Sequence, residues 1–186
     1  MIALSDAVNR GAIPNAEIVL VLSDKADARG LLAGQERGIE TLVIERGGRK
    51  REEHEAEVIS ALKQYDVDLI CLAGYMRLLS PSFIDAFPRR ILNIHPSLLP
   101  SFPGLDAQRQ AIAHGVKFSG CTVHFVDTTL DGGPIIAQRV VPILDGDTED
   151  SLAERILEQE HFLYAEAVAL VLSGEIKVVG RRVVKK

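Results

Sequence analysis

The chain has 186 residues, with 21 Lys or Arg and 26 Asp or Glu, which gives a formal net charge of −5. A chain of this length is expected to form one domain and to bury roughly 70% of its unfolded surface. The composition, 47% hydrophobic and 25% charged, excludes a disordered or collagen-like chain, and the acidic balance argues against broad nucleic-acid binding.

The first half of the chain alternates short apolar runs with longer helical stretches. The opening segment, 1–11, has a helical pattern, and helices are also expected over 27–37 and 50–65. The apolar runs are rich in Val, Ile and Leu without polar alternation, which is typical of parallel strands buried on both faces. They span 18–24, 41–45, 68–74 and 91–95. This order predicts a doubly wound α/β fold.

The pattern changes in the second half. Two strand-like runs, 120–127 and 134–143, are joined by a Gly-rich turn, so a hairpin or two adjacent strands are expected. A long helix is predicted at about 149–172, capped by a polar side chain just before it. The last segment, 175–186, is expected to add an edge strand whose Lys and Arg residues discourage further pairing.

The chain has two cysteines, Cys71 and Cys121, and both sit in apolar runs. They are expected to be buried thiols in a reducing compartment. The start of the chain has no basic segment followed by an apolar stretch, and no apolar run approaches the ~18–20 residues of a membrane span. A cytoplasmic protein without a membrane contact is therefore expected.

The segment NIHPSLLPSFPG (93–104) is the densest in chemical groups. Ligands of doubly wound sheets bind beyond the carboxyl ends of the strands, and Asn93 and His95 end one strand on the same face. Their N–H groups could stabilise a developing oxyanion. The alternative is that Asn93 satisfies loop backbone and His95 is a structural histidine, and these residues alone do not separate the two.

A second candidate segment, CTVHFVDTTLDGGPI (121–135), carries His124 on a strand and Asp131 in a Gly-rich turn. A carboxylate near His95 would favour the charged imidazolium and could receive a proton. Taken alone, Asp131 is better explained by turn chemistry, because Asp-Gly is a common turn pair. His124, taken alone, is better explained as a structural residue.

The remaining motifs predict no metal and no nucleotide cofactor. The five histidines show no zinc-ligand spacing. The chain has neither a Walker loop nor a G-x-G-x-x-G motif. The run RGGRKR (46–51) has four basic residues in six. A solvated loop that enters a helix explains this run best, and a site for an anionic ligand is the alternative.

Four longer segments of the sequence, considered together, are specific enough to indicate a family. They are LAGYMRLLSP (72–81), ILNIHPSLLPSFPGLDAQRQAI (91–112), TVHFVDTTLDGGPII (122–136) and DTEDSLAERILEQEH (147–161). This set resembles the phosphoribosylglycinamide formyltransferase family, the folate-dependent enzymes of purine biosynthesis. The resemblance covers nearly the whole chain, from the first helix to the last.

The resemblance implies a single domain over 1–186 with a Rossmann-like formyltransferase fold. Such a fold has a mostly parallel sheet with antiparallel C-terminal strands and helices on both faces. The implied reaction transfers a formyl group from 10-formyltetrahydrofolate to the amine of glycinamide ribonucleotide. Neither a metal, nor a nucleic acid, nor a membrane takes part, and a monomer or homodimer is expected.

By the same resemblance, the family's catalytic Asn, His and Asp fall on Asn93, His95 and Asp131. The amine would attack the formyl carbon, and Asn93 and protonated His95 would stabilise the oxyanion. Asp131 would keep His95 charged and help to move the proton from the amine to the leaving nitrogen. This role replaces the turn-only interpretation of Asp131.

The resemblance also implies the binding residues. The turn around Asp131 would line the pterin pocket, and Glu160 would contact glycinamide ribonucleotide. Thr122 and His124 would support the catalytic group. Folate contacts fall on Arg51, Met76, Arg77, Leu78, Leu79 and Asn93.

The chain departs from the family at its start. Family members begin with a strand and a Gly-Ser-Asn-type loop that holds the ribonucleotide phosphate at a helix N-terminus, and Met1 falls where that helix begins. A strand and turn of roughly a dozen residues are therefore expected to be missing. Either the 186 residues start at an internal methionine of a longer protein, or the short form is inactive or completed by another chain.

Three rival functions remain open. Formyltetrahydrofolate hydrolase shares the Asn, His and Asp, but it has an extra N-terminal domain and a different residue after the histidine, where this chain has Pro96. Methionyl-tRNA formyltransferase has an additional C-terminal tRNA-binding domain. A truncated homologue that binds folate but is catalytically impaired is the rival of a different class.

Overall fold

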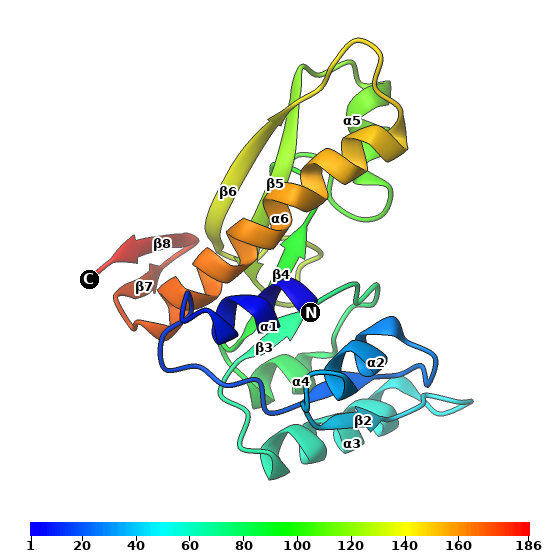
Figure 1. The fold of residues 1–186 in the computed structure, drawn as a ribbon, viewed down its shortest axis with the longest axis vertical. Helices are drawn as coiled ribbons and strands as arrows, with labels where there is room; N and C mark the ends of the chain where they lie inside the picture. Colours follow the sequence, from blue (N-terminus) through cyan, green and yellow to red (C-terminus); the bar gives the residue numbers. More distant parts are fainter.

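The computed structural model describes residues 1–186, which form six helices and eight strands (Figure 1). The predicted alternation of strands and helices is confirmed, and two short helices, α4 and α5, fall in segments for which no element is predicted. In chain order the elements are α1 (Ile2–Asn9), β1 (Val21–Ser23), α2 (Arg29–Gln35), β2 (Thr41–Val43), α3 (Arg51–Gln64), β3 (Ile70–Leu72), α4 (Pro81–Ala86), β4 (Ile91–His95), α5 (Ala107–Ala113), β5 (Phe118–Phe125), β6 (Ile135–Pro142), α6 (Glu149–Leu172), β7 (Ile176–Val179) and β8 (Arg182–Lys185).

The strands form two sheets instead of the single predicted one. Strands β1 and β2 pair in parallel as a two-stranded sheet, and the other six are ordered β3-β4-β5-β6-β8-β7. Strands β3 and β4 are parallel, whereas β5 and β6 form the expected antiparallel hairpin. An α/β fold with antiparallel C-terminal strands is therefore confirmed. Within residues 1–186, no strand pairs with the outer edge of β1 or of β3.

The tail folds as a hairpin instead of the single edge strand expected. Strands β7 and β8 pair antiparallel around a tight turn that starts at Gly180, whose φ of 60° is easily reached only by glycine. Strand β8 joins the main sheet through the pairing of Arg182 with Ile135. Two short strands replace one because this turn reverses the chain in the middle of the predicted run.

The core lies on both faces of the large sheet, as successive residues of β4 show. Leu92 packs in a cluster with β5, β6, α1 and α6, whereas its neighbour Ile91 packs with α3 and α4. Because side chains alternate across a strand, the two clusters lie on opposite faces. Helices on both faces are thus confirmed. In Figure 1, α6 runs along the β5–β6 hairpin and α3 and α4 lie lower in the view, whereas α2 lies next to α1, which packs on α6.

Helix α6 begins where a polar cap is predicted. The Thr148 hydroxyl accepts the backbone N–H of Ser151, and Asp147 accepts the N–H of Leu144. Arg155, two turns into the helix, donates to both oxygens of Asp147 and holds the pKa of that carboxyl well below its usual range. Neither α6 nor any other helix is both long and apolar enough to cross a membrane. Of the two thiols, Cys121 is buried and Cys71 is half-buried.

Tyr164→Phe is expected to destabilise the fold by about 1–3 kcal/mol, because it leaves buried carbonyls without their donor. The Tyr164 hydroxyl lies 2.9 Å from the carbonyl oxygen of Leu72 and 3.0 Å from that of Leu92, so it ties α6 to β3 and β4. Urea unfolding measures the change. Tyr65→Phe is the control, because the Tyr65 hydroxyl makes no hydrogen bond, and an equal loss in both variants would contradict this role for Tyr164.

Candidate active site

Four polar side chains meet where β4 ends. Strand β5 pairs antiparallel with β4 so that His124 lies opposite Asn93 and Thr122 lies opposite His95. Residues directly opposite in such a pair share a face of the sheet, and Asn93 and His95 share it by strand alternation. The apolar residues of β4 that alternate with Asn93 and His95 point to the core on the other face of the sheet. The predicted placement of Asn93 and His95 on one face is therefore confirmed.

His95 is held between a carbonyl and a carboxylate. Its Nε2–H donates to the carbonyl oxygen of Phe102 over 2.9 Å, and its Nδ1 lies 3.5 Å from Oδ2 of Asp131. The ring is only 5% exposed. Both nitrogens thus face acceptors, an arrangement that suits a charged imidazolium.

The loop after β4 supplies the carbonyl that faces His95. Phe102 has a φ of 54°, a conformation that bulky residues rarely adopt. Its carbonyl oxygen accepts from His95 and also from the Ser97 hydroxyl, at 3.3 Å. No pattern in the sequence identifies Phe102 as part of the site, because only the folded loop brings it back to His95.

Asp131 is both a turn residue and a site residue. It has a φ of 46°, which Asp tolerates better than most residues, and its Oδ2 accepts the backbone N–H of Gly104 over 2.8 Å. The same oxygen is the one that faces His95. The turn interpretation and the catalytic one are therefore compatible, because the turn conformation aims the carboxylate at the imidazole.

His124 orients the amide of Asn93. Its Nδ1–H donates to the carbonyl oxygen of Phe125 over 2.9 Å, and burial lowers the pKa of His124, which keeps the ring neutral. Its Nε2 therefore accepts a hydrogen bond from Nδ2 of Asn93, over 3.2 Å. One amide N–H and the carbonyl oxygen of Asn93 remain without a protein partner and are available to a ligand.

Thr122 supports the loop after β4 and makes no side-chain hydrogen bond to His95. Its hydroxyl donates to Ser97 O at 2.6 Å and accepts from Leu99 N–H at 3.0 Å. Gln138, opposite Thr122 on β6, donates to Leu99 O and to the Thr122 hydroxyl. Gln138 was not predicted as a site residue, although the register of the predicted hairpin would have placed it beside Thr122.

Apart from Asn93, the expected folate residues make no hydrogen bond to the side chains of this cluster. Met76 and Leu78 are exposed, whereas the side chain of Leu79 is buried in the core, so that a ligand could reach only its backbone. Arg77 pairs with Asp24 over 3.0 Å. Arg51 is exposed at the start of α3 and pairs with its neighbour Glu52. No hydrogen bond joins any of these side chains to His95 or Asn93.

Glu55 anchors the end of the segment that carries Met76 to Leu79. Its carboxylate is 2% exposed, and both of its oxygens lie 3.2 Å from the backbone N–H of Ser80. Glu55 stands one helical turn after Arg51 on α3. It thus fixes the segment relative to this helix, a contact across 25 residues that the sequence does not reveal.

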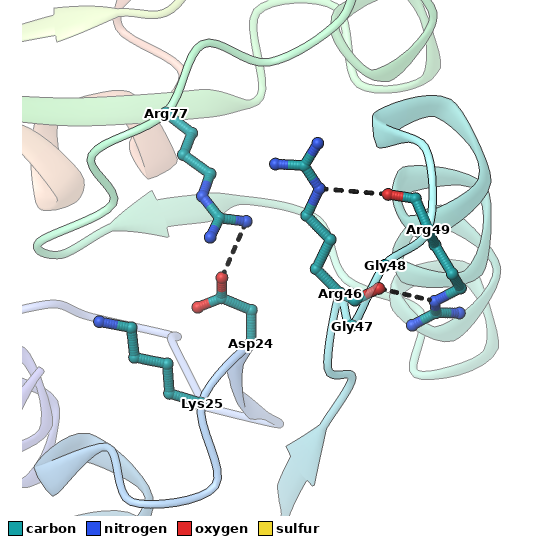
Figure 2. Close-up of a pocket in the computed structure, with 7 residues that line it drawn as sticks. All are labelled: Asp24, Lys25, Arg46, Gly47, Gly48, Arg49 and Arg77. Carbon is teal, nitrogen blue, oxygen red and sulfur yellow. Dashed lines mark hydrogen bonds and ion pairs between the residues drawn. The ribbon is translucent and has the colours of Figure 1, made fainter.

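A cavity of about 430 Å³ lies beside Arg77 (Figure 2). The loops that follow β1, β2 and β3 line this open cavity, and none of its lining residues is hydrophobic. Because β1 pairs in parallel with β2, and β3 with β4, the cavity takes its residues from the carboxyl ends of strands, as the cluster at β4 does. Its lining is Asp24, Lys25, Arg46, Gly47, Gly48, Arg49 and Arg77.

Glu160 lies on α6, away from the cluster at β4. It is half-buried, burial raises its pKa to about 7, and it stands close enough to Cys121 to raise the pKa of that thiol as well. Cys121 belongs to the core on the α6 face. The structure therefore does not bring Glu160 into contact with Asn93, His95 or Asp131.

Glu160→Gln is expected to stabilise the fold by up to about 3 kcal/mol at pH 8 and hardly at all at pH 4.5. The pKa of Glu160 rises from its ordinary 4.5 to about 7 on folding. The folded state thus binds more protons than the unfolded state in this window, so stability falls as the pH rises from 4.5 to 7. Thermal unfolding at both pH values checks this. Glu154→Gln, on the exposed face of α6, should show no such dependence.

Comparison with known proteins identifies the family model that this chain fits. Residues 1–168 match the model described as formyl transferase. The chain is 48% identical over 174 residues to the trifunctional purine biosynthetic protein adenosine-3 of Drosophila melanogaster, which covers 92% of this chain and 13% of that protein. It is 43% identical over 159 residues to the phosphoribosylglycinamide formyltransferase of Escherichia coli, which covers 85% of this chain and 75% of that protein.

The chain is also similar to a solved structure of a glycinamide ribonucleotide transformylase. The glycinamide ribonucleotide transformylase 1 of Symbiobacterium toebii has a TM-score of 0.96 and 49% identity to this chain, and the match covers 99% of this chain and 87% of that one. The chain therefore spans a small part of the trifunctional relative and most of the other two. On the family match over residues 1–168 and this structural likeness, the chain belongs to the formyl transferase family.

Proposed function

We propose that residues 1–186 form one domain that transfers a formyl group from 10-formyltetrahydrofolate to the amine of glycinamide ribonucleotide, in purine biosynthesis. The observation that carries this proposal is the cluster of Asn93, His95 and Asp131 at the carboxyl end of β4. The names of the relatives support the substrates, since they include a phosphoribosylglycinamide formyltransferase and a purine biosynthetic protein. The reaction needs amide, imidazole and carboxylate groups, and the cluster supplies one of each.

The proposed reaction begins when the amine of the ribonucleotide attacks the formyl carbon. The formyl oxygen becomes an oxyanion, which the free N–H of Asn93 and the imidazolium of His95 stabilise. Asp131 balances the charge of His95 and takes the proton that the attacking nitrogen loses, directly or through water. The bond between the formyl carbon and the folate nitrogen then breaks, and this nitrogen receives the proton. Neutral His124 keeps the Asn93 amide in the orientation that the first step needs.

The binding residues belong to the same proposal. Folate is assigned to Arg51, to Asn93 and to the segment from Met76 to Leu79, and glycinamide ribonucleotide to Glu160. The rigid attachment of this segment to α3 through Glu55 supports the folate assignment, because a preformed surface binds at lower entropic cost. A cytoplasmic location, a monomer or homodimer, and the absence of a nucleic-acid partner stay predictions.

Arg51→Ala is expected to raise KM for the formyl donor about tenfold and to leave kcat nearly unchanged, because a charge-assisted contact to a folate carboxylate is lost. Initial rates at varied donor concentration check this. Arg10→Ala is the matched control, since Arg10 is exposed and forms no ion pair. An unchanged KM in the Arg51 variant would remove Arg51 from the folate site.

The phosphate loop of the family is proposed to lie outside residues 1–186. The free outer edges of β1 and β3 support this, because a further parallel strand would pair with both. Calorimetry with glycinamide ribonucleotide and with a folate analogue is the test. Folate binding without ribonucleotide binding would favour a folate-binding module over the enzyme.

Donor consumption separates transfer from hydrolysis. The chain is incubated with 10-formyltetrahydrofolate, with and without glycinamide ribonucleotide. A transferase consumes the donor only when the amine is present, and that is the expected result. Release of formate without the amine would instead favour a formyltetrahydrofolate hydrolase.

A further inference from the structure

The turn that carries Asp131 has little room on its inner side. A Cβ at Gly132 would lie 2.5 Å from Cγ2 of Thr129, and a Cβ at Gly133 would lie 1.8 Å from the carbonyl oxygen of Phe125. Only glycine fits at either position, and glycine leaves the backbone its largest conformational freedom. The two glycines have no side chain that could hold the turn, so its place depends on what its backbone groups bind.

The carbonyl of Gly132 is held from a distant part of the chain. Nη2 of Arg181 donates to this oxygen over 2.8 Å, across 49 residues of sequence. No backbone N–H donates to the same oxygen. A hydrogen bond from a charged guanidinium is roughly twice as strong as one between neutral groups. Arg181 is therefore the partner that ties this part of the turn to the rest of the protein.

The hairpin of β7 and β8, which carries Arg181, is itself fixed to the body of the protein. Strand β8 joins the main sheet where Arg182 pairs with Ile135, three residues after Gly132. In Figure 1 this red hairpin lies beside the start of β6. Its apolar side chains pack against the core, and they are Ile176, Val178 and Val183. The hairpin thus gives Arg181 a firm base next to the Asp131 turn.

The Asp131 carboxylate on the same turn has to be placed accurately. Its Oδ2 accepts the N–H of Gly104 over 2.8 Å and lies 3.5 Å from Nδ1 of His95. An ordinary N–H···O hydrogen bond is about 2.9 Å long, so this oxygen stands about 0.6 Å short of such a bond to the imidazole. Because a misplacement of about 1 Å can cost roughly 10²-fold in rate, a small shift of the turn would slow the reaction.

We propose that Arg181 is a positioning residue for Asp131. From the β7–β8 hairpin it holds the carbonyl of Gly132, and it thereby keeps the adjacent carboxylate within reach of His95. Arg181 itself makes no hydrogen bond to Asp131 or to His95. The effect on turnover rests on the proposed function, whereas the place of Asp131 can be measured without any substrate.

Amide hydrogen exchange at Gly104, followed by NMR, reports the place of Asp131 in the free protein, because Oδ2 of Asp131 is the acceptor of this N–H. Arg181→Ala is expected to speed the exchange at least about threefold. Asp131→Ala removes the acceptor and sets the upper limit. Arg182→Ala is the matched control, since this neighbouring arginine is exposed and only its backbone pairs with the sheet. It should change the exchange by less than about 1.5-fold.

Turnover is the second measurement. Arg181→Ala should lower kcat about threefold to tenfold, because one hydrogen bond that positions an acid–base group is lost. KM for glycinamide ribonucleotide should change less than about twofold, since Asp131 acts in the reaction itself. Arg181→Lys should recover at least about half of the lost kcat, because an ammonium can still donate to the Gly132 carbonyl. Arg182→Ala should keep the wild-type kcat.

The proposal is overturned if exchange at Gly104 is the same in the Arg181→Ala protein and in wild type, if kcat of that variant is unchanged, or if Arg182→Ala has the same effects as Arg181→Ala. Failure of the wild-type protein to transfer a formyl group would instead contradict the proposed function. In that case the exchange at Gly104 still decides whether Arg181 holds the turn of Asp131.

Discussion

His95→Ala is expected to lower kcat for formyl transfer by at least about 10²-fold, the usual contribution of a positioned acid–base group. The imidazole is buried, and its Nδ1 lies 3.5 Å from Oδ2 of Asp131, so the variant removes the ring that faces this carboxylate oxygen. Initial rates with both substrates saturating measure the loss. KM should change much less than kcat, because the stabilised oxyanion exists only during the reaction.

A matched control separates lost chemistry from lost structure. His161→Ala removes an exposed histidine that contacts no residue of the cluster, and it should keep wild-type turnover. Asp131→Asn tests the negative charge of Asp131 by itself. The amide oxygen can still accept the Gly104 N–H, whereas the charge is removed. Near-normal turnover in the His95 variant would remove His95 from the reaction.

Gly133→Ala is expected to destabilise the fold by at least about 3 kcal/mol and to lower turnover as well. A Cβ at this position would lie 1.8 Å from the carbonyl oxygen of Phe125, a backbone atom that cannot move aside cheaply. The neighbouring bond from Phe125 N–H to Pro134 O, 2.9 Å long, must give way. Asp131 stands two residues earlier in the same turn, so its carboxylate shifts away from His95. Urea unfolding and kcat are the two measurements.

Gly146→Ala is the control for this substitution. A Cβ there meets nothing within 4 Å, and its φ is not in the left-handed region. The free energy of unfolding should change by less than about 1 kcal/mol, with a small gain from reduced freedom of the unfolded chain. Equal stability of the Gly133 variant and wild type would show that the turn can accommodate a side chain and does not fix Asp131.

The sequence predicts best those elements whose boundaries are marked by local chemistry. The predicted bounds of α6 match the structure, because the Thr148 cap and a long apolar face define this helix. Strand β1, by contrast, spans only Val21–Ser23 of the predicted run 18–24. Strand length depends on how far the partner β2 extends, and an apolar run does not contain that information.

For the candidate site, strand alternation was enough to place Asn93 and His95 on one face. Phe102, Gln138 and Glu55 were not predicted, because each acts through a contact that exists only after folding. The carbonyl of Phe102 reaches His95 through an unusual backbone conformation, and Glu55 reaches Ser80 across 25 residues. Neither contact leaves a motif in the sequence.

The basic run 46–51 is a further feature whose place in the structure the sequence does not reveal. Four residues of the run are exposed, as expected of a solvated loop, whereas Arg46 and Arg49 are half-buried and line a cavity. Lys25 and Arg77 complete that cavity from loops more than 20 residues away on either side. Only the parallel pairing of β1 with β2, and the packing of the β3 loop beside them, gathers these charges into one place.

The central claim is that Asn93, His95 and Asp131 carry out formyl transfer, and a labelled formyl group tests it most directly. The measurement follows the isotope from 10-formyltetrahydrofolate into glycinamide ribonucleotide, by mass spectrometry of the product. Wild-type protein is expected to give the labelled formyl product, and His95→Ala and Asp131→Asn should form it at least about 10²-fold more slowly. Equal rates in all three proteins would contradict the claim, as would the absence of labelled product from wild-type protein that binds both substrates.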